Sequence, residues 1–556
     1  GENLQIGTYD GKPLTTELSG NVIDVCPVGA LTNKVFRFRA RPWELVAKES
    51  LGYHDALGSN LFLHVRRGDV LRTVPRDNEA VNECWLSDRD RYSHQGLYAG
   101  DRATTPMLRE GGEWREAGWD EALARAAQIL RANGADQLGM LVHPSTSSEE
   151  GELLVRLAEA LGTGNLDHRI AQQDLSACAE PFAMPVADIE QADAIVIVGS
   201  QLRHELPLVH ARVRKAVSRG AKVHVVNPVD FEFTFDVASK RIVPPSRLAS
   251  ALGDVALGEA SRAVVIVGGV AEAGPHAAAI RDAARAFATA NNAALCRVPQ
   301  GANAVGLARA GVLPKSRDAQ AMLRDPRAAY VTYGIEPGLD FADQALAMRA
   351  LRDAQVVAFS HFACESTRAV ADVILPIGAL PEIDATLVNL EGREQRAVAG
   401  GKLPGEARAG WRVLRALGGL LEAPGFEFTD LAGLRDTLAR RAWDGARGAT
   451  AAAAPGEGLE VVASQAIYRV DAVVRRAAAL QAHPLTVGAR LALHPDDARA
   501  AGIADGAMAR VAVAEGKATL PASIDDRVAP GCAWIESGYG ASAPLLAAGR
   551  VEVQAA

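Results

Sequence analysis

The chain has 556 residues and a formal net charge of −8, and it is 48% hydrophobic and 23% charged. These proportions are those of globular proteins, so they exclude a disordered or collagen-like chain. The length predicts several domains of roughly 100–200 residues each. The acidic balance argues against a broad nucleic-acid surface, which needs clustered Lys and Arg, and the 5% aromatic content fits base stacking poorly.

The first hundred residues combine a polar start with a β-rich stretch. Residues 21–31 form a compact segment around Cys26. Further on, two apolar runs at 60–66 and 69–74 are separated by an Arg-Gly pair. Two such runs with a two-residue connection predict a β-hairpin.

The middle of the chain repeats one theme, an apolar strand followed by a helix. A first helix is predicted over 119–132, where Leu123, Ala127 and Leu130 share one face. Strands are then expected at 193–200, 220–228, 263–269, 329–334 and 355–360, and helices at 208–219, 276–289 and 341–352. Continuous apolar strands that alternate with helices indicate an α/β fold with doubly wound parallel sheets. Any ligand would lie at the carboxyl ends of the strands.

The last part of the chain reads as a linker and a small β-rich domain. Residues 444–459 are rich in Ala and Gly, which predicts a linker. Residues 509–514 and 516–521 suggest paired strands around Glu515-Gly516, and a short helix is expected to begin after His494. Together these elements predict a small C-terminal β-barrel.

The cysteines are few and scattered: Cys26, Cys84, Cys178, Cys296, Cys364 and Cys532. No two stand at a Cys-x2-Cys spacing, so the sequence contains no disulfide scaffold and no self-contained zinc or iron–sulfur motif. Sparse cysteines fit a reducing compartment, and no apolar run approaches the ~20 residues of a membrane helix. Cys26 precedes a proline, as does the last cysteine of ferredoxin-type cluster motifs. On this pattern alone, a buried core thiol is the stronger alternative for Cys26, and the other five are expected to be structural.

Six segments of the first 90 residues carry a resemblance to a known family: 1–9 (GENLQIGTY), 17–32 (ELSGNVIDVCPVGALT), 43–45 (WEL), 55–60 (DALGSN), 74–83 (VPRDNEAVNE) and 85–89 (WLSDR). They resemble the large iron–sulfur subunit, of 75-kDa type, of bacterial NADH:quinone oxidoreductase, the respiratory complex I. The resemblance extends over essentially the whole chain.

The resemblance implies a role for Cys26. In that family, the cysteine of the Cys-Pro-Val-Gly-Ala-Leu motif is the last ligand of a 4Fe–4S cluster, so Cys26 is expected to be a cofactor-binding metal ligand. Its three partner ligands would come from a Cys-x2-Cys-x2-Cys run before Gly1, a stretch that would also hold a 2Fe–2S and a second 4Fe–4S cluster. We therefore expect the sequence to begin within a longer chain.

The resemblance also implies a place in the cell. The chain would take part in electron transfer from NADH to quinone in the peripheral arm of the complex, on the cytoplasmic face of the bacterial inner membrane. Its partners would be other peripheral-arm subunits, and those would bind NADH and quinone. Neither nucleic acid nor a direct membrane span is expected.

Much of the chain also resembles the molybdopterin oxidoreductase superfamily. The segments that carry this resemblance are 199–200, 220–228, 301–304, 367–376, 389–393, 405–408, 493–499 and 505–506. The expected domains are the end of a ferredoxin-like iron–sulfur domain (1–44), a small β-rich domain (45–101), molybdopterin oxidoreductase-like α/β domains (102–443), a linker (444–480) and a dinucleotide-binding-type barrel (481–556). The small β-rich domain resembles the 4Fe–4S module of the molybdenum and tungsten enzymes without its cysteines.

Three departures indicate that this molybdopterin-type part is a scaffold without its cofactor. The cluster cysteines of related enzymes fall at four residues that are not thiolates: Gly52, Asp55, Ser59 and Ser87. The metal-ligating position of formate dehydrogenases falls near Gln172 or Gln173, which are neutral amides. The strand-end acid that would bind a nucleotide ribose is Asn227. No molybdopterin and no catalytic residue are therefore expected, since function resides in sites rather than folds.

Two polar groups have simpler interpretations. Arg212, Arg214 and Lys215 are expected to form the solvated face of a crossover helix. His54 and Asp55 could form a polar cluster near the iron–sulfur module, but a surface loop pair is the favoured interpretation.

Two alternative functions stay open at this point. One is a molybdopterin-dependent oxidoreductase such as a formate dehydrogenase. The other is a purely structural subunit in which Cys26 is a core residue.

Overall fold

The computed structural model describes residues 8, 11–441, 457–513 and 516–556. Its first part, here called the N-terminal module (residues 11–101), contains two short α-helices and a three-stranded antiparallel sheet. Its elements are α1 (Asn21–Val25), β1 (Val46–Leu51), β2 (Asn60–Arg66), β3 (Asp69–Pro75) and α2 (Asp88–Tyr92). The predicted hairpin is confirmed as β2–β3. Arg67 and Gly68 both have positive φ, at 54° and 85°, as a tight two-residue turn requires.

The first α/β domain is built on a seven-stranded sheet in the order β5-β4-β15-β14-β13-β6-β7. Its strands are β4 (Met107–Glu110), β5 (Glu113–Glu116), β6 (Leu138–Val142), β7 (Leu166–Asp167), β13 (Ala329–Tyr333), β14 (Gln355–Ser360) and β15 (Val373–Pro376). The five strands from β15 to β7 are parallel, and β4 and β5 form an antiparallel edge. Helices cover both faces, so the central strands are buried throughout and read as continuous apolar runs.

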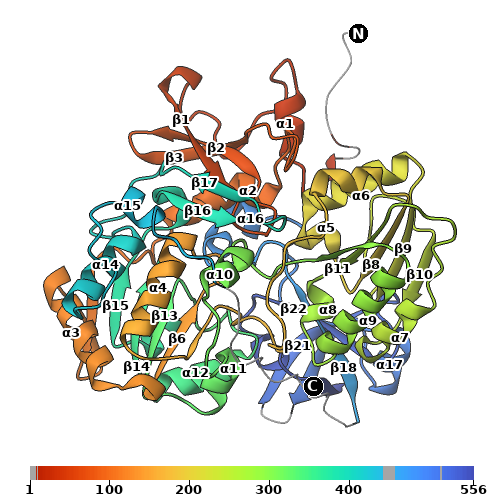
Figure 1. Cartoon of the computed structure of the whole chain (residues 1–556). Helices are drawn as coiled ribbons and strands as arrows, with labels where there is room; N and C mark the ends of the chain where they lie inside the picture. Colours follow the sequence, from red (N-terminus) through yellow and green to blue (C-terminus); the bar gives the residue numbers. More distant parts are fainter. Residues whose placement is uncertain (1–7, 9–10, 442–456, 514–515) are drawn as a thin grey trace.

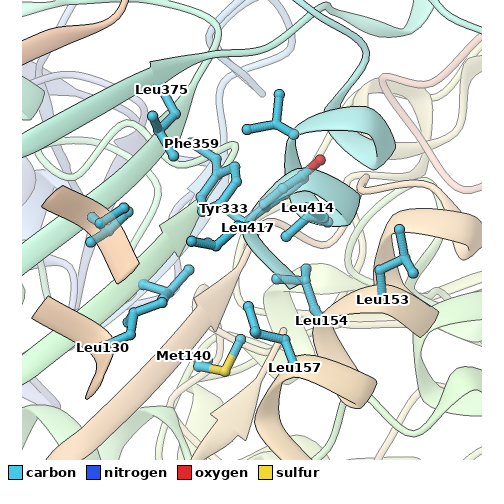
Figure 2. Packing of buried hydrophobic residues seen from close by; sticks show 14 of the residues in the cluster. Leu130, Met140, Leu153, Leu154, Leu157, Tyr333, Phe359, Leu375, Leu414 and Leu417 are labelled. Carbon is cyan, nitrogen blue, oxygen red and sulfur yellow. The ribbon is translucent and has the colours of Figure 1, made fainter. Parts of the chain in front are cut away.

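The main core of this domain lies between the sheet and three helices. These are α3 (Trp119–Ala132), α4 (Ser148–Ala160) and α14 (Gly410–Leu420). Figure 2 shows Leu130, Leu154 and Leu417 from these helices packed around Tyr333 and Phe359 of the sheet. The opposite face carries α11 (Ala319–Arg324), α12 (Gln344–Arg352) and α13 (Glu365–Val370), and α10 (Ala304–Ala310) packs against α4. The helix predicted over 119–132 is confirmed as α3.

The second α/β domain interrupts the first one between β7 and β13. Its strands are β8 (Ala194–Val198), β9 (Lys222–Asn227), β10 (Ser239–Ile242), β11 (Ala263–Val267) and β12 (Ala294–Arg297), all parallel, in the order β10-β9-β8-β11-β12. Its helices are α5 (Leu202–Glu205), α6 (Pro207–Ser218), α7 (Leu248–Gly253), α8 (Gly269–Glu272) and α9 (Ala277–Ala290). The predicted strands and helices are therefore present, but they divide between two separate sheets.

The C-terminal part is a closed six-stranded barrel in the order β18-β22-β19-β21-β20-β23. Its elements are β18 (Leu459–Gln465), β19 (Leu491–Leu493), α17 (Pro495–Ala500), β20 (Met508–Val513), β21 (Gly516–Ile524), β22 (Cys532–Ser537) and β23 (Arg550–Ala555). The predicted barrel and the helix that begins after His494 are confirmed. The expected strand pair is β20–β21, although residues 514–515 of its turn lie outside the described residues.

The expected linker needs a correction. Residues 442–456 lie outside the described residues, but 459–465 form β18, which pairs in parallel with β22 and closes the barrel. The sequence reason is the buried run from Glu460 to Val462 that follows the Ala- and Gly-rich stretch. Residues 474–481, also assigned to the linker, form a short 3-10 turn and α16 (Ala478–Gln481).

The N-terminal module lies across the two α/β domains (Figure 1). Helix α16 packs against α2, so a C-terminal segment supports the module from below. A hairpin of β16 (Ala385–Val388) and β17 (Glu394–Ala397) lies beside β1, and Val398 donates a backbone hydrogen bond to Glu49. The last helix of the first α/β domain is α15 (Leu431–Arg435). The module therefore contacts segments from three other parts of the chain.

Candidate functional site

Cys26 stands in an exposed turn of the N-terminal module. It directly follows α1, and Gly29, with a φ of 64°, lets the next residues turn back around the sulfur. The backbone N–H of Leu31 is the largest cause that lowers the pKa of the Cys26 thiol, and the N–H groups of Val28 and Ala30 act in the same direction. Such N–H groups favour the thiolate, which is the form that ligates iron.

The surroundings of Cys26 fit a ligand that completes a cluster with other residues. Among the residues that the structure describes, no group of three or more His, Cys, Asp or Glu could hold a metal ion. Cys26 thus offers one fitting thiolate and needs three more. Around it, Val22, Val25 and Val28 are exposed, with 76% exposure at Val28. An apolar rim of this kind fits contact with further protein around the sulfur.

The other cysteines lack this environment. Cys296, Cys364 and Cys532 are buried, and burial raises the pKa of the Cys296 thiol to about 12. This agrees with their prediction as core thiols. Cys178 is half-buried and Cys84 is exposed, and burial is the largest cause that raises the pKa of each. Neither thiol is therefore favoured as a thiolate.

A buried carboxylate lies among Gly52, Ser59 and Ser87, three of the positions that the superfamily resemblance aligns with cluster cysteines. Asp90 accepts a hydrogen bond from Ser87 Oγ at 3.0 Å, and a Cβ added to Gly52 would lie 2.6 Å from Asp90 Oδ1. Gly52 donates its backbone N–H to the Ser59 carbonyl at 2.7 Å, which closes the loop. Burial, and then the charge of Asp55, raises the pKa of Asp90 to about 6. These residues do not fit an iron–sulfur cluster, because they supply no thiolate and no free space.

The expectation of a surface loop at His54 and Asp55 is wrong. His54 is buried, and its Nδ1 lies 2.6 Å from Asp471 Oδ2. Asp55 pairs at 2.7 Å with Arg89, whose guanidinium also donates to the Ile467 carbonyl. We call these five residues together with Asp90 the junction network, since they join the N-terminal module to the segment after β18.

Arg212 is also not on a solvated face. Its side chain is buried, pairs with Glu190 at 2.6 Å and donates to the backbone carbonyls of Glu79 and Val81. Lys215 pairs with Glu83 and Glu190, and Arg214 alone is exposed as expected. The crossover helix α6 therefore contacts the N-terminal module through Arg212 and Lys215, two side chains that the sequence pattern predicted to face solvent.

The residues that the resemblance aligns with a molybdopterin site make other contacts in this structure. A cavity of about 170 Å³ lies where both α/β domains, the module and the segment after β18 meet, and its lining includes His54, Gln173 and Asp471. Gln173 donates its amide to the Leu546 carbonyl at 2.9 Å, so it is a neutral, engaged side chain. Asn227 accepts a hydrogen bond from the backbone N–H of Ser200 and donates one to its carbonyl, so both ends of its amide are engaged. The donor set does not fit a molybdenum or tungsten centre, which prefers soft thiolate ligands.

The comparisons with known proteins agree with this architecture. Residues 102–420 match the molybdopterin oxidoreductase family, and 462–554 match the molybdopterin dinucleotide binding domain. Residues 45–95 match the "NADH-ubiquinone oxidoreductase NDSU1/NuoG-like, 4Fe-4S domain", and 1–32 match the "NADH-quinone oxidoreductase subunit 3, ferredoxin-like domain".

Three curated relatives are subunits of one enzyme. The NADH-ubiquinone oxidoreductase 78 kDa subunit of Candida albicans is 35% identical over 439 residues, covering 76% of this chain and 59% of the relative. The same subunit of Neurospora crassa is 35% identical, covering 79% and 60%. The NADH dehydrogenase [ubiquinone] iron-sulfur protein 1 of Solanum tuberosum is 32% identical, covering 75% and 57%. The chain thus spans about three fifths of the length of these relatives.

A solved structure shows the fold alone. Acetylene hydratase from Pelobacter acetylenicus superposes with a TM-score of 0.60 at 14% sequence identity, covering 88% of this chain and 93% of that one. The architecture is therefore that of the molybdopterin oxidoreductases. From the matched family model, the chain belongs to the molybdopterin oxidoreductase family, and its N-terminal domains and curated relatives show that it is similar to the large iron–sulfur subunits of NADH:ubiquinone oxidoreductase.

Proposed function

We propose that this chain works in an NADH:quinone oxidoreductase, as an electron-transfer subunit of the peripheral arm. The 35% identity to the 78-kDa subunits and the two matched iron–sulfur domains support this proposal. NADH and quinone would bind to other subunits of the arm, which are the partners of this chain. The same proposal includes the expected domain boundaries at residues 44 and 101, which separate the ferredoxin-like end, the small β-rich domain and the α/β domains.

The observation that carries the proposal is the environment of Cys26. Cys26 is partly exposed in a turn whose neighbouring residues 27–30 are exposed, and the N–H groups of residues 28–31 favour its thiolate form. We propose Cys26 as the fourth ligand of a 4Fe–4S cluster, completed by three thiolates from outside the 556 residues. Such a cluster supplies one-electron redox chemistry. The chain itself would hold the sulfur, direct N–H groups toward it and shield it with the apolar rim of α1.

The rest of the chain serves as a scaffold in this proposal. At the position that the resemblance aligns with a molybdenum ligand stands Gln173, a neutral amide that bonds the Leu546 carbonyl. Asp90 lies among the residues that the resemblance aligns with cluster cysteines, bonded to Ser87. A molybdopterin-dependent activity, the main alternative from the sequence, does not fit these residues.

We place the chain at the cytoplasmic face of the bacterial inner membrane as a peripheral subunit. Among the described residues, no helix is both long and apolar enough to cross a membrane. That finding agrees with a subunit held by protein contacts.

The experiment that tests the proposal replaces Cys26 by Ala in the assembled complex. We expect one 4Fe–4S signal to disappear from the electron paramagnetic resonance spectrum and NADH-driven quinone reduction to stop. Cys84→Ala is the matched control, since Cys84 is also an accessible thiol of the N-terminal module. Unchanged spectra and turnover in Cys26→Ala would refute the electron-transfer role, and the purely structural alternative would then hold.

A further inference from the structure

The five-stranded sheet of the second α/β domain has a switch point between β8 and β11. From β8 the strand order continues through β9 to one edge, and from β11 it continues through β12 to the other edge. The connections on the two sides leave in opposite directions, so a crevice opens at the carboxyl ends of these two strands. Open α/β sheets bind the phosphates of dinucleotides in this crevice, on backbone N–H groups.

The side chain of Glu205 accepts hydrogen bonds from backbone N–H groups of this crevice. Its Oε2 accepts hydrogen bonds from the backbone N–H of Gly269, which follows β11, at 2.8 Å and from Ser200 Oγ, which follows β8, at 3.1 Å. Its Oε1 accepts from the backbone N–H of Gln201 at 2.9 Å. One carboxyl group thus bonds the loops on both sides of the switch point, as a bound anion would.

The two loops also close tightly behind this carboxyl group. A Cβ added to Gly268 would lie 2.2 Å from Ser200 Cβ, and one added to Gly199 would lie 2.5 Å from Ala271 Cβ. Glu205, Gly269 and Gln173 then line the cavity described above. The remaining space lies beyond Glu205, so the carboxyl group of Glu205 stands between this space and the N–H groups of the two loops.

We infer that Glu205 is an internal ligand that takes the place of a phosphate in the crevice, and that the crevice without this side chain binds a small carboxylate or phosphate. The chain thereby excludes a dinucleotide by supplying its own anion. The inference concerns a different region from Cys26 and does not depend on the electron-transfer proposal. Burial is the largest cause that raises the pKa of Glu205, and the hydrogen bond from Gly269 is the largest cause that opposes it.

The test is anion rescue of the 556-residue chain. Glu205→Ala should lower the midpoint of thermal unfolding, and millimolar formate or phosphate should restore at least half of the loss with a saturating dependence. Chloride at the same ionic strength measures the general effect of salt. Comparison of formate with phosphate tells whether the crevice takes a planar carboxylate or a tetrahedral anion.

Leu202→Ala is the matched control for instability. Leu202 lies on the same helix, α5, and is fully buried, but its apolar side chain offers no hydrogen-bonding group to the crevice. Formate and phosphate should not restore this variant. If Glu205→Ala is insoluble, the yield of its refolding in formate is compared with the yield in chloride, and a higher yield in formate reports the same rescue.

Three outcomes overturn the inference. Glu205→Ala could be as stable as the wild-type chain, it could lose stability without any rescue by formate or phosphate, or the rescue could be equal with chloride or in Leu202→Ala. Selective and saturating rescue of Glu205→Ala supports it.

Discussion

Replacing Asp90 by Asn should stabilise the protein at neutral pH. Asp90 is only 3% exposed, and its Oδ1 has no hydrogen-bond partner within the described structure. Because burial raises its pKa from 3.8 to about 6, the folded protein favours the protonated form. The carboxyl group therefore lowers stability as the pH rises from about 4 to about 6, and the full penalty persists above that range. Asn has nearly the same shape and never ionises.

The magnitude follows from the shift in pKa. The difference between 3.8 and about 6 is about two pH units. At about 1.4 kcal/mol for each unit, the ionised Asp90 costs about 3 kcal/mol at pH 8. About half of this penalty is already present at pH 5, so the advantage of Asp90→Asn should grow by about 1–2 kcal/mol from pH 5 to pH 8.

Urea titrations of both proteins at pH 5 and pH 8 measure this change. Any fixed cost of the amide cancels between the two pH values, because it is present at both. Asp55→Asn is the control, and it should change stability in the opposite direction, because it leaves the buried Arg89 guanidinium without its ion pair at 2.7 Å. It should destabilise the protein by about 3 kcal/mol at pH 5, and by less at pH 8, because the charge of Asp55 also helps to raise the pKa of Asp90. An advantage of Asp90→Asn that is equal at both pH values, or smaller at pH 8, would refute the reasoning.

Three further predictions follow from the same structure. Arg102→Ala should lower the free energy of unfolding by about 3–5 kcal/mol, because it leaves the buried Glu382 carboxylate without the two hydrogen bonds from Arg102. The double variant Arg102→Leu/Glu382→Leu should lower it by less in the same urea titration. Leu417→Ala should cost about 2–5 kcal/mol in the core of Figure 2, whereas the exposed Leu420→Ala should change stability by less than about 0.5 kcal/mol. Protein purified from molybdenum-fed cells should contain no stoichiometric molybdenum or tungsten by elemental analysis, and a full equivalent would contradict the scaffold assignment.

Local signals in the sequence were enough to predict most elements. The bounds of α3 match the predicted helix over 119–132, because its apolar residues follow the helical period and a glycine precedes it. The β2–β3 hairpin followed from its two-residue turn. The partition into two sheets could not be predicted, because β11 and β13 are equally buried and only their partners in space assign them to different sheets.

The site was harder to predict where it depends on distant partners. The environment of Cys26 is local, so its motif was informative, although its role as a ligand rests on the resemblance and stays a prediction. His54 and Asp55 looked like loop residues because their partners, Asp471 and Arg89, lie 417 and 34 residues away. Glu205 was missed for a similar reason, since the donor Gly269 is 64 residues away and no motif marks the carboxyl group.

The contact between His54 and Asp471 has a consequence for synthesis of the chain. The N-terminal module leaves the ribosome before the other domains of the 556 residues, and domains begin to fold as they emerge. Its two buried groups, His54 and Arg89, reach Asp471 and Ile467 only after more than four fifths of the chain has been translated. Until then, His54 in the loop between β1 and β2 has no Asp471 to contact, and Arg89 on α2 keeps only partners such as Asp55 within the part already made. A module made before the two α/β domains should thus become rigid only after both of them.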